Sequence, residues 1–353
     1  MNTMNKKIFT AAQIPFFAIM LILFTMFTSC SDNKSSETRE VSTNEVVLDT
    51  SDSQTEKKLA YIVSDIRIPF WDIMARGIKN AANSKGYVVE VYSAHNIKKT
   101  ELENTAKAIK DKVSGIVISP INSSTAVTIL KLAKNAGIPV VISDIGTDSG
   151  EYISFISSNN LDGAYKIGKV LAKRMKELGL DKDGSVGIIS IPQQRANGKA
   201  RTAGFMKAMD EAGIKGTGLR QQVTFSYQET YDFSKELIEK NSDLKALWLQ
   251  GSDRYQGALD AIKDAGKKDD ILLICFDAEP VFLELIPNGT LVGAAMQQPY
   301  LMGEEAVYAM DRYLKGKDVE KYVQLPILAI SKENIEQKLP IIKRNVLGIE
   351  IKD

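Results

Sequence analysis

The sequence has few of the residues that most often carry chemistry. Its 353 residues include one histidine, His95, and two cysteines, Cys30 and Cys275. A histidine-based catalytic triad or multi-histidine metal site would therefore depend on a single residue in a predicted loop. The sequence also contains no cysteine cluster, Walker A loop or G-x-S-x-G elbow. We predict that the chain is not an enzyme and binds no metal or cofactor.

The chain also lacks an excess of charge of either sign. It has 45 Lys and Arg against 44 Asp and Glu, and Lys6 and Lys7 lie in the leader described next. There is thus no basic surplus to drive binding to nucleic acid. The 44% hydrophobic and 25% charged content is typical of a soluble globular protein, and the length is sufficient for two domains.

The first thirty residues have the pattern of an export signal. Lys6 and Lys7 precede the apolar stretch "PFFAIMLILFTMF", and "FTSC" ends it at Cys30. This order resembles the lipobox of bacterial lipoproteins, with Phe27 where that motif more often has leucine. The resemblance implies a signal peptide at 1–29 and a lipid on Cys30 that holds the mature chain to a membrane. An uncleaved anchor is the alternative, but the apolar run is shorter than the ~20 residues that span a bilayer.

Residues 30–58 are rich in Ser, Thr, Asp, Glu and Asn and contain no aromatic residue. Such a composition cannot form a core, so we predict a disordered tether after the lipidated Cys30. Cys275 lies in the apolar run "ILLICF" and would then have no partner for an internal disulfide. We expect it to be a buried small hydrophobe rather than a reactive thiol.

From Leu59 onward, short apolar runs alternate with amphipathic helical patterns. The predicted strands cover 59–64, 87–92, 115–119, 138–143, 185–190, 219–225, 246–250, 271–276 and 291–296. Several are almost wholly apolar, as strands buried on both faces of a parallel sheet must be. The alternation predicts an α/β protein with two doubly wound parallel-sheet lobes, a closed βα barrel being the alternative. In both folds, ligands bind at the carboxyl ends of the strands.

The residues that follow these strands combine aromatic rings, carboxylates, amides and guanidinium groups. They include Phe70, Trp71, Asp144, Arg195, Asn197, Arg201, Phe225, Asp277 and Gln297. A polyhydroxylated ligand suits this set, because each hydroxyl both donates and accepts and the C–H face of a sugar ring stacks on an aromatic side chain. Adjacent residues such as Phe70 and Trp71 point about 100° apart on a helix, so one core face cannot easily bury both. Asp253 and Arg254 also follow a strand, but they open a predicted helix and are left out of this set.

Five blocks of the sequence together resemble the periplasmic sugar-binding proteins of the ribose/galactose type. They are "SDIRIPFWDIMARGIKNAANSKGY", "GIVISPINSS", "AGIPVVISD", "ARTAGFMKAM" and "GAAMQQPYLMGEEAV", and the similarity runs from Leu59 to Asn334. The resemblance implies a type I fold, in which two lobes joined by three hinge crossovers close on a sugar. It places 59–158 plus 299–326 in an N-terminal lobe and 159–298 plus 327–353 in a C-terminal lobe.

The resemblance also implies which residues bind the ligand. They are Phe70, Trp71, Asp144, Arg201, Phe225, Asp277 and Gln297, while Arg195 and Asn197 lie where galactose-type binders place polar contacts. Three positions depart from the ribose-binder pattern: Ile68 and Gly251 replace asparagines, and Ile145 replaces an arginine. The loss of three polar groups argues against ribose itself. Ile68 and Gly251 remain possible ligand-binding positions.

These features predict a monomeric, extracytoplasmic lipoprotein, in the periplasm or at the cell surface, that captures a neutral monosaccharide or related polyol. Its expected partner is the membrane permease of an ABC-type transporter. A receptor that signals to a membrane histidine kinase is the main alternative. A glycoside-processing enzyme that uses Asp144 and Asp277 as its acid/base pair is a remote one. A sugar-responsive repressor would need a helix-turn-helix where this sequence has its signal and tether, so no nucleic-acid partner is expected.

Overall fold

The computed structural model describes residues 57–349. The predicted signal peptide, Cys30 and nearly all of the predicted tether lie outside these residues. Residues Gln54–Asp353 form one compact unit, to which both lobes described below belong. Within the described residues, no helix has the length and apolar character needed to cross a membrane.

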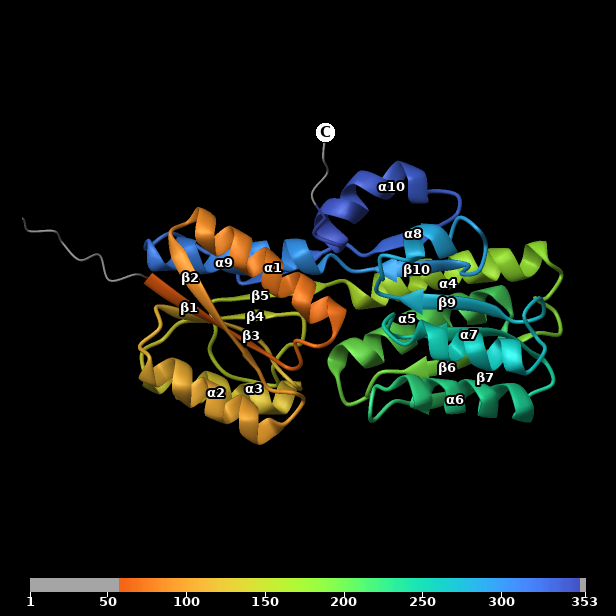
Figure 1. The fold of residues 1–353 in the computed structure, drawn as a ribbon, viewed down its shortest axis with the longest axis horizontal. Coiled ribbons are helices and arrows are strands. Elements are labelled where there is room, and N and C mark those ends of the chain that lie inside the picture. Colours follow the sequence, from red (N-terminus) through yellow and green to blue (C-terminus); the bar gives the residue numbers. More distant parts are fainter. Residues whose placement is uncertain (1–56, 350–353) are drawn as a thin grey trace, which may run out of the picture. The chain divides into compact units, whose positions relative to one another are not determined.

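The N-terminal lobe is built on a six-stranded sheet in which all neighbouring strands are parallel (Figure 1). In spatial order its strands are β11 (Tyr322–Leu325), β5 (Ser154–Ser158), β4 (Val140–Ser143), β3 (Gly115–Ser119), β1 (Lys57–Val63) and β2 (Tyr87–Ser93). Its helices are α1 (Pro69–Ser84), α2 (Lys98–Lys110), α3 (Ser123–Asn135) and α9 (Pro299–Leu314). Helices α1 and α9 cover one face of the sheet, and α2 and α3 cover the other.

The C-terminal lobe is built on a second six-stranded sheet, in which only β12 runs antiparallel to its neighbour. In spatial order its strands are β12 (Leu328–Ser331), β10 (Gly293–Met296), β9 (Leu272–Phe276), β8 (Leu244–Leu249), β6 (Ser185–Ser190) and β7 (Lys215–Gln221). Its helices are α4 (Asn160–Glu177), α5 (Ala196–Ala212), α6 (Tyr227–Lys240), α7 (Tyr255–Asp264), α8 (Phe282–Leu285), α10 (Ile335–Ile341) and the π-helical η1 (Ile342–Val346).

The chain passes between the two sheets after β5, after β10 and after β11. Two separate sheets joined by three crossovers confirm the predicted two-lobed α/β fold, and the closed barrel is excluded for the described residues. The crossovers also direct the carboxyl ends of the parallel strands of both lobes toward one another, which is where the ligand site was expected.

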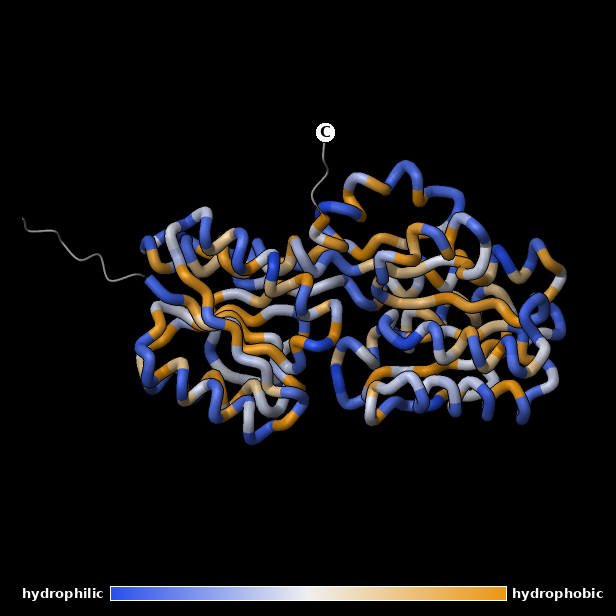
Figure 2. The backbone as a smooth tube through the Cα atoms, viewed as in Figure 1, coloured by the Kyte–Doolittle hydropathy of each residue, from blue (hydrophilic) through white to orange (hydrophobic). Residues whose placement is uncertain are grey.

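Alternation of side chains along the central strands explains why both faces of each sheet are covered. In β1, Leu59, Tyr61 and Val63 pack under α1 and α9, whereas Ala60 and Ile62 pack against α2 and α3. Strands buried on both sides must be apolar at every position, and Figure 2 shows the central strands as mostly hydrophobic.

The core of the C-terminal lobe follows the same rule. Trp248 of β8 stacks on Phe205 of α5, with ring centroids 3.9 Å apart. Cys275 of β9 is fully buried in the cluster on the other face of the sheet. Its burial raises the pKa of the thiol, which disfavours the nucleophilic thiolate. The predicted role of Cys275 as a buried small hydrophobe is therefore confirmed.

Some predicted strand bounds are wrong. The strand predicted at 219–225 lies instead at Lys215–Gln221, as β7. Its start was not predicted because Gly216 and Gly218 interrupt the apolar pattern there. Strand β1 begins at Lys57, inside the stretch assigned to the tether. Strands β5, β11 and β12 were not predicted: each has only four or five residues, and β11 lies at a sheet edge with every second side chain exposed.

The C-terminal segment (335–349) connects the two lobes by side-chain contacts. Ile342 packs into the core of the C-terminal lobe. Toward the N-terminal lobe, Arg344 forms a bidentate ion pair with the buried Glu304 of α9, with Nη2 2.9 Å from Oε1. Arg76 of α1 donates to two backbone carbonyls near the end of the segment, at 2.9 and 3.0 Å. The segment therefore joins the core of one lobe to two helices of the other.

Candidate ligand-binding site

A pocket lies where the carboxyl ends of strands from both lobes meet, and it encloses about 520 Å³, including the part open to solvent. Its lining includes every residue that the sequence analysis named as ligand-binding or possibly so: Ile68, Phe70, Trp71, Asp144, Arg195, Asn197, Arg201, Phe225, Gly251, Asp277 and Gln297. The fold thus brings together residues up to 229 positions apart. Their roles in binding remain predictions.

Asp144 follows β4 and is the acidic group that the N-terminal lobe contributes. Its side chain is buried, and Oδ1 has no hydrogen-bond partner among the described residues. Burial raises the pKa of Asp144 to about 6, although Arg201 and Arg195 act in the opposite direction. Asp144 lines the pocket, and a buried carboxylate oxygen without a donor is chemically suited to a ligand's O–H or N–H.

Arg201 lies in α5 and is the centre of a polar network in the C-terminal lobe. Its Nε donates to Asn160 Oδ1 at 2.8 Å, and its Nη1 donates to the carbonyl of Gln250 at 2.7 Å. Nη1 is also 3.5 Å from Asp277 Oδ2, and the guanidinium lies 3.8 Å from the centre of the Phe276 ring. These contacts hold a buried guanidinium in one orientation, in contrast to the solvated position usual for an arginine on a helix.

Gln297 extends this network to the crossover after β10. Its Nε2 donates to Asp277 Oδ1 at 2.7 Å, which fixes the orientation of the amide. Gln297 Oε1 is then buried without a donor among the described residues. Burial also raises the pKa of Asp277, with Arg201 opposing the shift. The C-terminal lobe thus contributes a second unsatisfied acceptor to the pocket.

Aromatic side chains form the apolar walls. Phe70 and Trp71 meet edge to face, with centroids 4.9 Å apart and planes at 86°, and both line the pocket. Trp71 also packs in the core of the N-terminal lobe, so its ring contributes to both the core and the pocket wall. On the other lobe, Phe225 lies under the guanidinium groups of Arg195 and Arg254, at 5.6 and 5.0 Å.

Three of the six non-glycine residues with a positive φ angle among the described residues line the pocket. Asp144, Phe225 and Asp277 have φ angles of 68°, 54° and 67°, which non-glycine residues rarely adopt. Each immediately follows a strand or the short loop after it, so the turn directs the side chain into the pocket. Strained positions of this kind cost about 1–3 kcal/mol and tend to occur at functional sites.

Two of the three departures from the ribose-binder pattern line the pocket. Ile68 and Gly251 are part of its wall, so an alkyl group and a bare backbone stand where the resemblance gives amides. Ile145 does not line the pocket; it is buried in the core of the N-terminal lobe. Its replacement of an arginine therefore removes a charged group from this side of the site.

The structure adds residues to the pocket that the sequence analysis did not include: Ile191, Gln250, Ser252, Asp253, Arg254 and Glu279. Asp253 and Arg254 were set aside as the start of a helix. Arg254 does precede α7, but its side chain is buried and turned onto the Phe225 ring. Both residues come soon after a predicted strand, as do the residues that the sequence analysis included in the ligand-binding set. This position was the signal that could have identified them.

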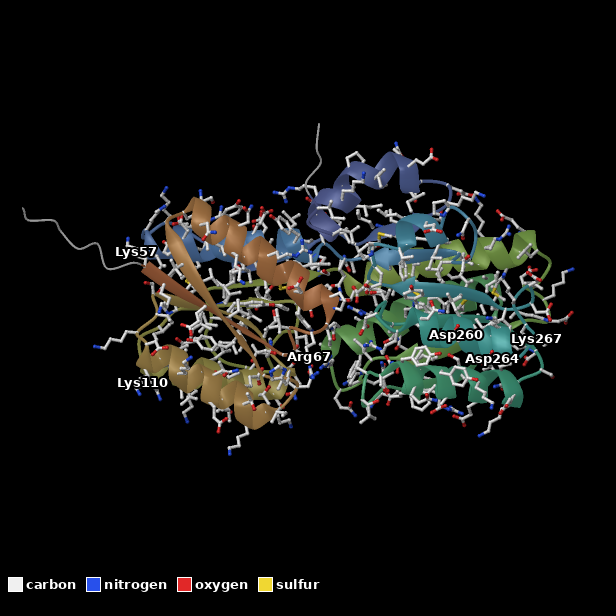
Figure 3. The ribbon with its side chains drawn as sticks, viewed as in Figure 1. Lys57, Arg67, Lys110, Asp260, Asp264 and Lys267 are labelled. Carbon is white, nitrogen blue, oxygen red and sulfur yellow. The ribbon has the colours of Figure 1, made fainter. Side chains whose placement is uncertain are left out.

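Beyond this pocket, the space between the lobes opens into a polar mouth lined partly by Asp65, Arg67 and His95. Arg67, labelled in Figure 3 at the edge of its lobe that faces the other lobe, pairs with Asp65 at 2.7 Å. His95 lies 3.7 Å from the same carboxylate and does not line the inner pocket. Within residues 57–349, no cluster of His, Cys, Asp and Glu side chains is suited to hold a metal ion.

Residues 59–318 match the periplasmic binding protein domain family. The chain belongs to this family. Among the curated relatives of this periplasmic binding protein, the ribose import binding protein of Bacillus subtilis is 27% identical over 278 residues, covering 78% of this chain and 88% of the relative. The ribose import binding protein of Escherichia coli is also 27% identical, over 276 residues, covering 78% of this chain and 90% of the relative.

Solved structures show the same fold. A carbohydrate transporter solute binding protein from Agrobacterium radiobacter, crystallised with D-arabinose, superposes on this periplasmic binding protein with a TM-score of 0.76 at 23% identity, covering 83% of this chain and 100% of the other. These findings confirm the resemblance to sugar-binding proteins of the ribose type, a location outside the cytoplasm, and a binding protein rather than an enzyme.

Proposed function

We propose that this protein is a lipid-anchored receptor that captures a neutral monosaccharide, or a closely related polyol, between its lobes and delivers it to an ABC-type sugar transporter. The residues that hold the sugar are Phe70, Trp71, Asp144, Arg201, Phe225, Asp277 and Gln297. Relatives that are import binding proteins for ribose and for D-apiose support the class of ligand and partner.

The observation that carries the proposal is the pair of buried acceptors without donors, Asp144 Oδ1 and Gln297 Oε1. Leaving a buried acceptor unpaired costs about 1–3 kcal/mol, so a ligand that donates to both recovers that free energy on binding. Sugar hydroxyls are such donors. A cationic ligand is disfavoured because Arg195, Arg201 and Arg254 line the same pocket, and an anionic one is disfavoured by the carboxylates there.

Isothermal titration calorimetry tests the class of ligand. We expect at least one of D-ribose, D-allose, D-arabinose, D-fucose and myo-inositol to bind with micromolar or tighter affinity, equally with and without a chelator. The physical reasons are the mixture of acidic and basic side chains that line the pocket and the lack, among residues 57–349, of a side-chain cluster suited to a metal ion. Binding of an amino acid or peptide with no response to any sugar or polyol would refute the proposed function.

A second measurement tests the lipid anchor at Cys30. We expect intact-mass analysis of protein extracted from membranes to show residues 1–29 removed and an acyl-modified Cys30. The Cys30→Ala variant should remain unprocessed, since the predicted lipidation needs the thiol. A Cys30→Ala chain that is still cleaved and membrane-bound would contradict the lipoprotein part of the proposal and leave the ligand class untouched.

A further inference from the structure

Gly251 leaves space that the guanidinium of Arg254 fills. A Cβ atom added to Gly251 would lie 3.0 Å from Arg254 Nη2 and 3.6 Å from Asp253 Oδ1. A contact of 3.0 Å is tighter than most Cβ contacts, so a side chain at 251 would require the end of Arg254 to shift by a few tenths of an ångström. Gly251 has an ordinary φ, so the need for glycine here comes from its neighbours rather than from the backbone.

Arg254 is held in this place and keeps one end available. It is buried, pairs with the carboxylate of Asp253 and lies against the Phe225 ring at 5.0 Å. Its Nη1 makes the hydrogen bonds, to Asp253 and, at 3.5 Å, to the carbonyl of Phe225. Its Nη2 has no hydrogen-bond partner among the described residues, although Arg254 lines the pocket. A charged donor is therefore free at this end of the site.

Glu279 provides an acceptor in the same wall. Ser252 donates its hydroxyl to Glu279 Oε1 at 2.7 Å, which orients the carboxylate. Glu279 Oε2 accepts no hydrogen bond from residues 57–349, and Glu279 lines the pocket. Burial, reinforced by the nearby Asp253 and Asp277, raises the pKa of Glu279 to about 7. At pH 8 the carboxylate is therefore mostly ionised and able to accept.

We propose that Arg254 and Glu279 are specificity-determining residues, which together bind one hydroxyl group of the sugar in the space beside Gly251. The hydroxyl accepts from Arg254 Nη2 and donates to Glu279 Oε2. This pair supplies the donor and acceptor that an asparagine at 251 would have supplied, but with charged groups that bind a hydroxyl more strongly than an amide does. The inference rests on the proposed function, since it assumes a sugar in this pocket.

The same pair selects against acidic sugars. A carboxylate in place of the hydroxyl would lie next to Glu279 and Asp253 without a proton to donate, and like charges at such range disfavour binding. Arg254 Nη2 would still donate to a carboxylate, but the single charge of Arg254 stands against three nearby carboxylates, those of Asp253, Asp277 and Glu279. A neutral sugar should therefore be preferred over the corresponding uronic acid.

The test is a set of calorimetric titrations at pH 8 with the five sugars and polyols named above. The one that binds the wild type most tightly is then titrated again as its monodeoxy analogues. We expect Arg254→Met and Glu279→Gln each to weaken binding of the parent sugar at least tenfold. For one monodeoxy analogue, the wild type should bind the analogue at least tenfold more weakly than it binds the parent sugar. Each variant should instead bind that analogue and the parent sugar with affinities within about threefold of each other. This loss of discrimination at one hydroxyl would not follow from a purely structural role.

Gly251→Ala gives a second readout, because an added Cβ lies 3.0 Å from Arg254 Nη2 and requires the guanidinium to shift. It should weaken binding more in the wild type than in the Arg254→Met background, where there is no guanidinium to shift. Arg220→Met and Glu284→Gln serve as controls, since Arg220 pairs with Glu236 outside the pocket and Glu284 is exposed. Ligand-free thermal midpoints identify any variant that fails to fold, and Glu279→Gln, which keeps the shape of the side chain, then decides the outcome.

The outcomes separate the two proposals. If the wild type binds no sugar or polyol at all, the proposed function fails. If the wild type binds a sugar but Glu279→Gln keeps full affinity and still discriminates every monodeoxy analogue, the inference about Arg254 and Glu279 is wrong and the proposed function stands.

Discussion

Replacement of Asp144 by asparagine should weaken sugar binding about tenfold to a hundredfold without destabilising the ligand-free protein. A hydrogen bond to a charged acceptor contributes about 1.5–3 kcal/mol, and each 1.4 kcal/mol corresponds to a factor of ten in Kd. In the empty pocket the ionised carboxylate is unfavourable: a pKa of about 6 instead of 3.8 corresponds to a cost of about 3 kcal/mol at neutral pH. The thermal midpoint of the ligand-free Asp144→Asn variant should therefore equal or exceed that of the wild type.

Calorimetry for affinity and differential scanning calorimetry for the ligand-free midpoint check this pair of effects. Asp148→Asn is the matched control, because it makes the same change four residues later at an exposed position. Affinity within twofold of the wild type, or a midpoint several degrees lower, would mean that Asp144 supports the fold instead of the ligand.

Sugar affinity should fall as the solution is acidified through pH 6. A hydroxyl that donates to Asp144 Oδ1 binds the ionised form, so binding lowers the pKa of a group that burial has raised to about 6. Acidification protonates the carboxylate in the free protein and removes the acceptor. From Asp144 alone we expect about tenfold weaker binding at pH 5 than at pH 7.5, with one proton released per sugar bound near pH 5.

The contribution of Asp144 to the stability of the ligand-free protein changes with pH in the opposite direction. Because the pKa of Asp144 is higher in the fold than in the unfolded chain, its contribution to stability is greatest below pH 4 and is lost as pH rises through 6. Acid should therefore weaken sugar binding while this group makes the ligand-free protein more stable. Titrations in buffers of different ionisation enthalpy measure the released proton, and the Asp144→Asn variant should lose this part of the pH dependence. An affinity that is constant from pH 7.5 to pH 5 would contradict the assignment of Asp144 as an acceptor.

The fold could be predicted from the sequence where burial was complete. Strands such as β3, which is buried at every position, appear as continuous apolar runs, and those runs alternate with helices that end at glycine. Edge strands could not be predicted in this way. β11 is stabilised by pairing with β5, a partner more than 160 residues away, and its own sequence has the alternation of a partly exposed segment.

The site could be predicted in part, for a related reason. Position after a strand indicated Asp144, Asp277 and Gln297, because the end of a parallel strand determines where the next side chains lie. The same rule applied to Arg254, but a charged residue at the start of a helix is most often solvated. The guanidinium of Arg254 packs beside Gly251, three residues earlier, where a side chain would crowd it, and against Asp253 and Phe225. The pocket therefore depends on a pairwise fit that spacing alone does not reveal.

The C-terminal segment (335–349) offers evolution a way to change sugar affinity without changing the pocket. None of its residues lines the pocket, yet it is packed into one lobe and bonded to the other through Arg344 and Glu304. In the proposed capture of a sugar by lobe closure, rotation about the crossovers would move these two residues relative to each other, and their ion pair would then contribute to the balance between open and closed populations. The apparent affinity is the intrinsic affinity multiplied by the fraction of molecules in the competent form. Substitutions at 344 or 304 can therefore adjust how much sugar the protein retains at a given concentration, while the pocket continues to decide which sugar that is.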